Sequence, residues 1–433
     1  MSRRPSRLQQ FRSWGAELCR RTLEPMLYSA GIYVYAGGVK LASLRHPKAR
    51  KMVAGHREVF TRLKQAVDSW REPVVWLHAA SLGEFEQGRP LLEMLRREHP
   101  EKRIVLSFFS PSGYEVRKDW KGADAVVYLP FDTPRNVRRF LDIIRPEKAI
   151  FVKYEFWRNY LYALWDRNVP TYLISAVFRK DQAFFRRSSA WYRQWLKLYS
   201  HIYVQDEGSR TLLERYGIEN VTVAGDTRFD RVTDIMRQRR EIPLLERFRR
   251  AAGEKPVIMA GSSWPEDEKV YAYWVNGHDV RLVIAPHEFD DARIARLKEL
   301  FPGAVTYTGA EKDPSLVDGA KVLVMDCFGL LSSAYTYADM AYVGGGFGAG
   351  LHNINEAAVY GIPVIYGPNN RKFIEARELR EAGGGFEVTD ADTFAKTAGV
   401  LLDEETRRTA GKKASAYIRS KLGATDRIFR DLF

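Results

Sequence analysis

The sequence contains only two cysteines, Cys19 and Cys327, and neither lies in a CxxC pair. This scarcity argues against a disulfide framework and a cysteine zinc site, and it fits a reducing compartment. No GxxxxGK[ST] segment occurs, which disfavours a P-loop NTPase. RNP, KH and helix-turn-helix signatures are also missing, so no motif indicates a nucleic-acid partner.

Long apolar runs are absent as well. The uncharged run from Pro25 to Val39 is shorter than the roughly 20 apolar residues of a transmembrane helix, and no small-residue cleavage site follows it. Basic residues flank the run on both sides: arginines at 3, 4, 7, 12, 20 and 21, then Lys40, Arg45, Lys48, Arg50 and Lys51. Such flanks favour a segment that lies in the lipid headgroup region. The alternative is an ordinary first helix packed on the core.

The chain has 433 residues and a formal net charge of +14. That length predicts two domains, since domains commonly hold roughly 100 to 200 residues. The charge indicates an acidic partner, which can be nucleic acid, an anionic membrane surface or a phosphorylated substrate. Charge alone does not choose among them.

From residue 74 onward, short runs rich in Val, Ile and aromatic residues alternate with longer amphipathic stretches, which is the βαβ pattern. A first series of strands is expected at 74–80, 104–109, 125–129, 149–152, 171–175, 202–204 and 221–223. A second series is expected at 257–260, 280–285, 304–307, 322–325, 340–343 and 364–366, after a charged helix at 241–253. Continuous apolar strands suit parallel sheets covered on both faces.

The pattern therefore predicts an α/β protein of GT-B architecture, with two Rossmann-like domains facing a central cleft. The expected parts are a membrane-associating segment at 1–50, a first domain at 51–232 and a second domain at 233–433.

Three polar segments follow strands of the first series. Glu84 ends His78-Ala-Ala-Ser-Leu-Gly-Glu84 and can accept a proton from a hydroxyl, or it can simply cap its helix. Glu155 leaves another strand where open sheets place ligands, although a solvated glutamate is the ordinary alternative. Arg228 can lie over a phosphate or a carboxylate, or it can form a surface pair with Asp226 or Asp230.

The second domain carries a glycine-rich loop, Gly344 to Gly350, that runs through His352 and Asn353 into a helix with Glu356. Backbone N–H groups and the helix dipole there suit a nucleotide phosphate, and Glu356 can accept hydrogen bonds from a ribose diol. His287, after another strand, is either a phosphate donor or a loop histidine in solvent.

The segments HAASLGE, EFW, GDTRFD, FGLL and HNINEAA followed by YGIPVIYGP occur in an order that resembles the 3-deoxy-D-manno-octulosonic acid (Kdo) transferases. The resemblance covers nearly the whole chain, including the amino-terminal segment. It implies an inverting, metal-independent transfer of Kdo from CMP-Kdo to a glucosamine hydroxyl of a lipid A precursor (lipid IVA), with release of CMP. It implies no cofactor and a place on the cytoplasmic side of the inner membrane.

Residue by residue, the resemblance implies that Glu84 is the general base and that Glu155 and Arg228 steady the transition state. The implied donor-binding residues are Ser263, Glu268, Pro286, His287, Phe328, Gly329, Leu330, His352, Asn353, Asn355 and Glu356. The family commonly has Pro-Arg-His where this chain has Pro286-His287-Glu288, so one cation of the phosphate loop is missing. The rival function is another GT-B transferase, or an epimerase, that uses a UDP-sugar.

Overall fold

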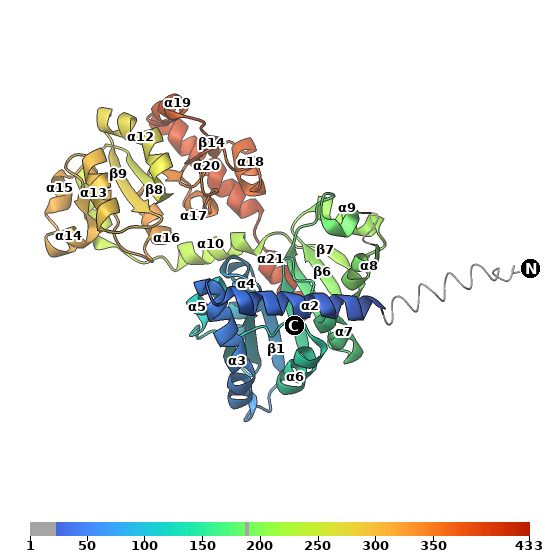
Figure 1. Ribbon diagram of the computed structural model, residues 1–433. Helices are drawn as coiled ribbons and strands as arrows, with labels where there is room; N and C mark the ends of the chain where they lie inside the picture. The colour runs from blue at the N-terminus through green and yellow to red at the C-terminus, as the bar shows by residue number, and fades with distance from the viewer. Residues whose placement is uncertain (1–22, 187–189) are drawn as a thin grey trace, which may run out of the picture. The chain divides into compact units, whose positions relative to one another are not determined.

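The computed structural model describes residues 23–186 and 190–433. The chain divides into two compact units (Figure 1): unit 1 is Met1–Arg228 with Gly423–Phe433, and unit 2 is Phe229–Leu422. The division falls between Arg228 and Phe229, close to the expected boundary after residue 232. The expected second domain extends to residue 433, however, whereas the last eleven residues (423–433) belong to unit 1.

Unit 1 is built on a seven-stranded parallel sheet in the order β3-β2-β1-β4-β5-β6-β7. Its strands are β1 Val74–Ala79, β2 Arg103–Phe108, β3 Ala125–Tyr128, β4 Lys148–Val152, β5 Thr171–Ala176, β6 His201–Val204 and β7 Val221–Val223. Its helices are α2 Glu24–Ala42, α3 Pro47–Val67, α4 Leu82–Glu98, α5 Pro111–Arg117, α6 Pro134–Ile144, α7 Arg158–Asp166, α8 Ala190–Arg193, α9 Glu207–Arg215 and α21 Ala424–Leu432, with 3-10 turns at Ala183–Phe185 and Gln194–Leu198.

Unit 2 repeats this architecture with strand order β10-β11-β9-β8-β12-β13-β14, again all parallel. Its strands are β8 Val257–Ser263, β9 Arg281–Pro286, β10 Val305–Thr306, β11 Val322–Val324, β12 Met340–Val343, β13 Val364–Tyr366 and β14 Gly385–Glu387. Its helices are α11 Pro243–Ala252, α12 Pro265–Gly277, α13 Asp291–Leu300, α14 Tyr307–Lys312, α15 Leu316–Gly319, α16 Leu331–Ala334, α17 Asn355–Ala358, α18 Ile374–Glu381, α19 Ala391–Leu401 and α20 Glu404–Ser420. The helix α10 Thr227–Arg237 begins in unit 1 and ends in unit 2.

Both faces of the first sheet are covered by helices, as the continuous apolar strands predict. Successive residues of β1 point to opposite faces: Val74 and Trp76 join one hydrophobic cluster, whereas Val75 and Leu77 join the other. The carboxyl-terminal helix α21 contributes Ile428 to the second cluster and packs against α4. This packing explains why the last segment belongs to unit 1.

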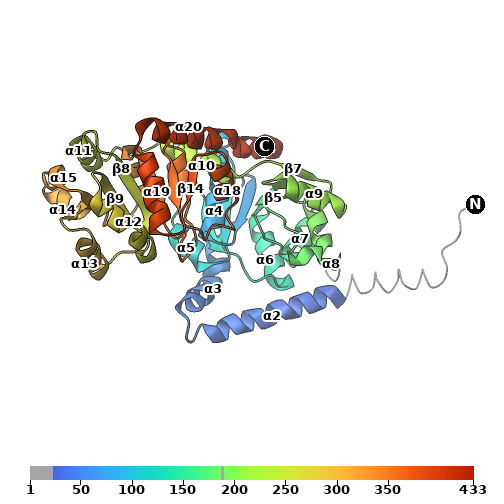
Figure 2. The ribbon, with the colours of Figure 1, turned by 90° about the horizontal axis from the view of Figure 1, so that it is seen from above.

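The first described helix, α2, runs along the outside of unit 1 (Figure 2). Its inner face makes polar and aromatic contacts. The Tyr28 hydroxyl donates to Oδ2 of Asp132 at 2.7 Å, Glu24 accepts from Nε of Arg158 at 2.9 Å, and the Tyr35 ring packs against Phe109 and Phe131. Large apolar side chains lie on its outer face and on the turn after it: Met26, Leu27, Tyr33, Val34, Leu41 and Leu44, all at least 56% exposed. Among the described residues, no helix is long and apolar enough to cross a membrane. The arginines at 3 to 21 lie outside the described residues.

Candidate active site

The predicted site residues gather at the carboxyl ends of the central strands, where open α/β sheets bind ligands. In the first sheet the strand order reverses between β1 and β4, and Glu84 and Glu155 follow these two strands. Lys153 and Ser175, at the ends of β4 and β5, have positive φ angles of 70° and 55°. Each such non-glycine position costs on the order of 1–3 kcal/mol, and such strain clusters at functional sites.

Glu84 is the third residue of α4, and its Oε2 accepts the backbone N–H of Ser81 at 3.1 Å. This contact is half of a capping box, so the helix-capping interpretation is present in the structure. Burial raises the pKa of Glu84, and the nearby charge of Glu155 raises it further. A carboxylate whose pKa is shifted toward neutrality is better suited to act as a general base.

Glu155 is almost fully buried, with 6% of its surface exposed. Its Oε2 lies 2.9 Å from Nε2 of His78 and accepts the indole N–H of Trp157 at 2.5 Å. The hydroxyl of Tyr199 donates to the backbone carbonyl of Glu155 at 2.6 Å. Three side chains thus fix the position of Glu155. It is a buried, hydrogen-bonded residue and not the solvated glutamate of the alternative interpretation.

Arg228 is the second residue of α10, and its guanidinium forms a two-point pair with Asp226 at 2.6 and 2.8 Å. The expected alternative of a pair with Asp226 is therefore found. Such a pair fixes the direction of the guanidinium. A role for Arg228 toward a leaving phosphate stays a prediction.

In unit 2 the strand order reverses between β8 and β12, and polar side chains follow both strands. Ser263 ends β8, and its hydroxyl lies 2.7 Å from that of Tyr271 and donates to Oε1 of Glu268 at 3.3 Å. Arg293 of α13 also contacts Oε1 of Glu268. Ser263 and Arg293 line a pocket of about 310 Å³. The buried Glu268 therefore holds Arg293 at the edge of a pocket.

Trp264, which lines this pocket, is one of three aromatic rings that lie next to one another. Trp264 follows β8, His287 follows Pro286 at the end of β9, and His352 follows the glycine loop. The ring centroids of Trp264 and His287 lie 4.7 Å apart, and those of His287 and His352 lie 4.4 Å apart. The two predicted donor-binding histidines are therefore neighbours.

Two further loops that were predicted to bind the donor meet at Glu356. Its Oε1 accepts from the Asn353 amide at 3.1 Å, and its Oε2 accepts from the hydroxyl of Ser332 at 2.7 Å. Ser332 lies in α16, directly after the Phe328, Gly329 and Leu330 segment. Phe328 is 76% exposed and stacks on Phe289 at 4.6 Å. These contacts tie the loop after β11 to the loop after β12.

Asn355 lies in the same segment and is fully buried, and neither polar atom of its side-chain amide has a hydrogen-bond partner among residues 23–186 and 190–433. Unpaired buried polar groups are rare and call for an explanation such as a ligand or an ion.

The glycine loop is tightly packed. A Cβ at Gly345 would lie 2.2 Å from the carbonyl oxygen of Gly350, and one at Gly346 would lie 2.7 Å from the backbone of Gly367. The helix after the loop, α17, has only four residues, and Glu356 is its second. The expected contribution of a helix dipole is therefore not supported, because a macrodipole needs several aligned turns.

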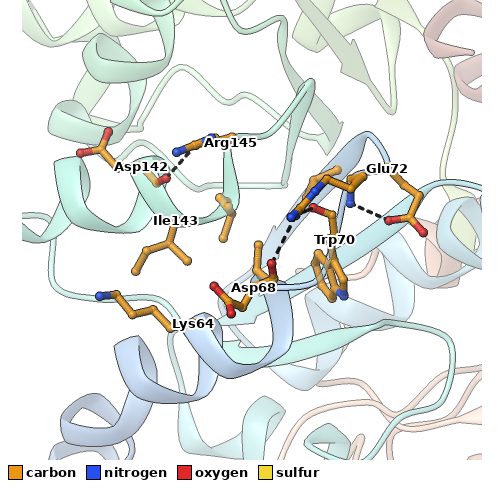
Figure 3. Close-up of a pocket in the computed structure, with 11 residues that line it drawn as sticks. Lys64, Asp68, Trp70, Glu72, Asp142, Ile143 and Arg145 are labelled. Carbon is orange, nitrogen blue, oxygen red and sulfur yellow. Dashed lines mark hydrogen bonds between the residues drawn. The ribbon is translucent and has the colours of Figure 1, made fainter.

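Two other features bear on what the structure can bind. A pocket of about 750 Å³ lies at the opposite edge of the first sheet, before β1 and β4, and Figure 3 shows Lys64 and Asp68 across from Asp142 and Arg145. It contains none of the predicted residues. In the part of the chain that the structure describes, no group of three or more His, Cys, Asp or Glu side chains is arranged to hold a metal ion.

Two site residues lacked a predicted role. His78 is a histidine within an otherwise apolar buried strand, which is an available signal for a functional hydrogen bond. No sequence signal marks Trp264, because His287 and His352, the rings it contacts, follow other strands.

Known proteins resemble this chain in sequence over most of its length. Residues 55–231 match a family described as 3-Deoxy-D-manno-octulosonic-acid transferase (kdotransferase). A 3-deoxy-D-manno-octulosonic acid transferase from Aquifex aeolicus is 30% identical over 76% of this chain and 86% of its own length. One of the same name from Bordetella pertussis is 27% identical over 92% of this chain and 97% of its own.

Solved structures with a similar fold include a UDP-GlcNAc 2-epimerase from Neisseria meningitidis bound to UDP-GlcNAc. Its TM-score is 0.59 at 14% sequence identity. The matched region covers 83% of this chain and 99% of the epimerase chain. A UDP-GlcNAc 2-epimerase from Methanocaldococcus jannaschii has a TM-score of 0.51, also at 14% identity. The match covers 81% of this chain and 99% of that epimerase chain. At this identity the likeness shows the fold alone, and with the two parallel sheets it confirms the predicted GT-B class of two Rossmann-like domains. On the sequence relationships, the chain belongs to the 3-deoxy-D-manno-octulosonic acid transferase family of glycosyltransferases.

Proposed function

We propose that the protein transfers Kdo from CMP-Kdo to a hydroxyl of a lipid A precursor, lipid IVA, with inversion at the anomeric carbon. Membership of the Kdo transferase family supports the reaction class. The structural observation that carries the proposal is Glu84 at the carboxyl end of β1, with its pKa raised by burial and by Glu155. That is the environment a general base requires.

In the proposed step the carboxylate of Glu84 takes the proton of the acceptor hydroxyl. The hydroxyl oxygen bonds to the anomeric carbon on the face opposite the nucleotide, and the bond from that carbon to the phosphate oxygen breaks. The electron pair leaves with CMP, so one displacement accounts for inversion. Glu155 has its carboxylate fixed by His78 and Trp157, and it steadies the positive charge that develops on the sugar.

Donor recognition is assigned to unit 2. The neighbouring His287 and His352 and the Asn353–Glu356 pair lie in the segments that follow β9 and β12. A monophosphate leaving group needs no metal to bridge two phosphates, and Arg228 is proposed to balance part of its charge. We therefore propose a metal-independent reaction.

The proposed location is the cytoplasmic side of the inner membrane. The outer face of α2 carries large exposed apolar side chains, and Lys40, Arg45 and Lys48 follow near its carboxyl end. An apolar helix face bordered by basic residues suits insertion among anionic headgroups. A helix held there would keep unit 1 next to a lipid acceptor.

The test is to incubate purified protein with CMP-Kdo and a tetra-acylated lipid A precursor, and to follow the lipid by mass spectrometry. The expected product carries one or more added Kdo masses, with CMP released in equal number. UDP-sugars serve as the alternative donors. Transfer from a UDP-sugar, or competition by UDP rather than CMP, would favour the rival GT-B function.

A further inference from the structure

Two arginines of α13, Arg293 and Arg296, line the pocket of about 310 Å³ in unit 2. Their surroundings differ: Arg296 is exposed, whereas the Arg293 side chain is only 13% exposed and contacts Oε1 of Glu268 through Nη2. Among the described residues, this carboxylate is the only hydrogen-bond partner of the Arg293 side chain. A guanidinium has five N–H donors. Nε and Nη1 of Arg293 therefore keep donors for a second anion.

Glu268 anchors Arg293 from behind. Glu268 is 2% exposed, and its Oε1 also accepts the hydroxyl of Ser263 at 3.3 Å. Since Ser263 donates its one proton there, the Tyr271 hydroxyl at 2.7 Å donates to Ser263. A buried ion pair adds little to stability compared with apolar side chains of the same size. Folding alone therefore does not account for this one.

The same pocket adjoins residues that were predicted to bind the donor. Ser263 ends β8, and its carbonyl oxygen accepts the backbone N–H of His287 at 3.0 Å. Trp264 follows in the lining, and the ring centroids of His287 and His352 lie 4.7 and 6.4 Å from its own. Ser263 and Trp264 thus connect the pocket of Arg293 to both histidines.

A nucleotide phosphate calls for a fixed positive charge, which His352 does not supply. Burial, together with the neighbouring His287, lowers the pKa of His352 to about 4, so its ring is neutral at pH 7. A guanidinium stays charged at that pH, and two of its parallel N–H groups match two phosphate oxygens. Arg293 meets both requirements.

Two carboxylates, Glu288 and Asp290, also line the pocket, and both residues are exposed. Oδ1 of Asp290 accepts the backbone N–H of Arg293 at 2.7 Å, as the cap of α13. Solvent and salt screen exposed charges much more than buried ones. The partly buried Arg293 is therefore the cation best placed to hold an anion in this pocket.

We propose that Arg293, oriented by Glu268, binds the phosphate of the nucleotide donor in unit 2. The inference rests on the proposed use of a nucleotide-activated sugar and names the side chain that holds its phosphate. Negative charge grows on this phosphate as its bond to the anomeric carbon breaks, and a guanidinium already in place stabilises that charge. Arg293 is thus a binding residue, and Glu268 is a positioning residue that acts through it.

The test compares CMP with cytidine, which lacks only the phosphate. Ligand-observed NMR on the full chain measures both, since it also follows weak binding. The loss of hydrogen bonds to a charged group should weaken CMP binding by Arg293→Gln about 10- to 100-fold and change cytidine binding less than about twofold. An equal loss for CMP and cytidine, or no loss for CMP, would overturn the proposal.

Two control variants change charges in the same pocket. Arg296→Gln removes an exposed cation from the same helix, and Glu288→Gln removes an exposed anion. Exposed charges contribute little, so each control should change CMP affinity by less than about threefold. If Arg296→Gln weakens CMP binding as much as Arg293→Gln does, the pocket acts through its net charge and the assignment to Arg293 is wrong.

A double variant keeps the test decisive, because Arg293→Gln alone leaves Glu268 buried without its cation and can destabilise unit 2. Arg293→Gln with Glu268→Gln removes both charges, leaves the net charge unchanged and allows the two amides to hydrogen-bond. It should lose CMP affinity as Arg293→Gln does and still bind cytidine. Glu268→Gln alone keeps a carbonyl acceptor for Arg293, so its loss should be smaller. Wild-type CMP affinity in the double variant would refute the role of Arg293.

Wild-type binding separates this inference from the proposed function. If the wild type binds UMP in place of CMP, the proposed donor is wrong, and UMP against uridine tests Arg293 in the same way. If it binds CMP no more tightly than cytidine, the assignment of Arg293 fails whatever lipid product is formed. A wild type that binds neither nucleotide counts against both.

Discussion

The indole N–H of Trp264 donates a hydrogen bond to Nε2 of His352, 3.1 Å away. An accepting Nε2 carries no proton, so neutral His352 must be protonated at Nδ1. Burial, together with the neighbouring His287, lowers the pKa of His352 to about 4. At neutral pH His352 is therefore an uncharged donor whose tautomer is set by Trp264.

Replacing Trp264 by Phe keeps an aromatic ring against His287 and removes only the indole donor. One hydrogen bond is worth about 1 kcal/mol, so affinity for CMP should fall about fivefold in titration calorimetry. The pKa of His352 should rise toward its usual value, because Nε2 loses the bond that favoured the neutral ring. Unchanged affinity together with an unchanged His352 titration would show that Trp264 is only packed there.

Glu84→Gln should abolish transfer while CMP-Kdo binding stays nearly intact. Loss of a general base lowers rates about 10²- to 10⁴-fold, as measured by lipid product formation. Glutamine can also complete a capping box, so the melting temperature should change little. Glu84→Ala is the matched variant that loses the cap as well and should melt at a lower temperature. Retained turnover in Glu84→Gln would remove the residue from the proposed role.

The pH profile should reflect the raised pKa of Glu84. The base must be ionised, so kcat/KM should fall as pH falls through an apparent pKa above the usual glutamate value of about 4.3. Lys153→Gln removes a positive charge that lowers the pKa of Glu84, and the acid limb should move to higher pH. Lys64→Gln, at the opposite edge of the same sheet, is the control and should leave the limb in place. A shift of the Lys153→Gln limb to lower pH would contradict the assignment.

The fold was largely predictable because its strands are continuous apolar runs with glycine-rich or polar ends. The expected strands at 221–223, 340–343 and 364–366 match β7, β12 and β13 residue for residue. The strand β14, Gly385–Glu387, was missed because three residues with one apolar side chain carry no periodic signal. The packing of α21 on α4 was also missed, since an amphipathic pattern does not identify which core a helix covers.

The positions of the site residues were predictable where they follow strands, as Glu84 and Glu155 do. Their partners were not, since His78 and Glu155 are 77 residues apart and meet only because β1 pairs with β4. The sequence predicted that the glycine loop runs into a helix but not that this helix, α17, has only four residues. Local sequence therefore locates the polar loops at strand ends, and the sheet order decides which of them meet.

Tyr28→Phe should loosen α2 from unit 1. Burial raises the pKa of Asp132 to about 6, and the hydrogen bond from Tyr28 opposes that rise. The loss of a bond to a carboxylate is worth about 1.5–3 kcal/mol, measurable by urea unfolding at pH 8. At pH 4 Asp132 is protonated in the folded state, so the loss should be smaller. Hydrogen exchange in α2 should become faster, and an equal loss at both pH values would show that the charge of Asp132 is not involved.

The membrane proposal is tested by charges placed on the outer face of α2. Leu27 and Val34 are 70% and 76% exposed, so Leu27→Glu with Val34→Glu should not disturb the core. Burying each such side chain in a headgroup region is worth about 1.5–3 kcal/mol, so binding to anionic vesicles should fall by more than tenfold in sedimentation. The matched control is Tyr273→Glu, which changes a 90% exposed side chain of α12 in unit 2 and should sediment like the wild type. Deleting residues 1–45 should release the protein altogether. Unchanged sedimentation of both the double variant and the deletion would mean that α2 is a structural helix of unit 1 and that another surface meets the lipid.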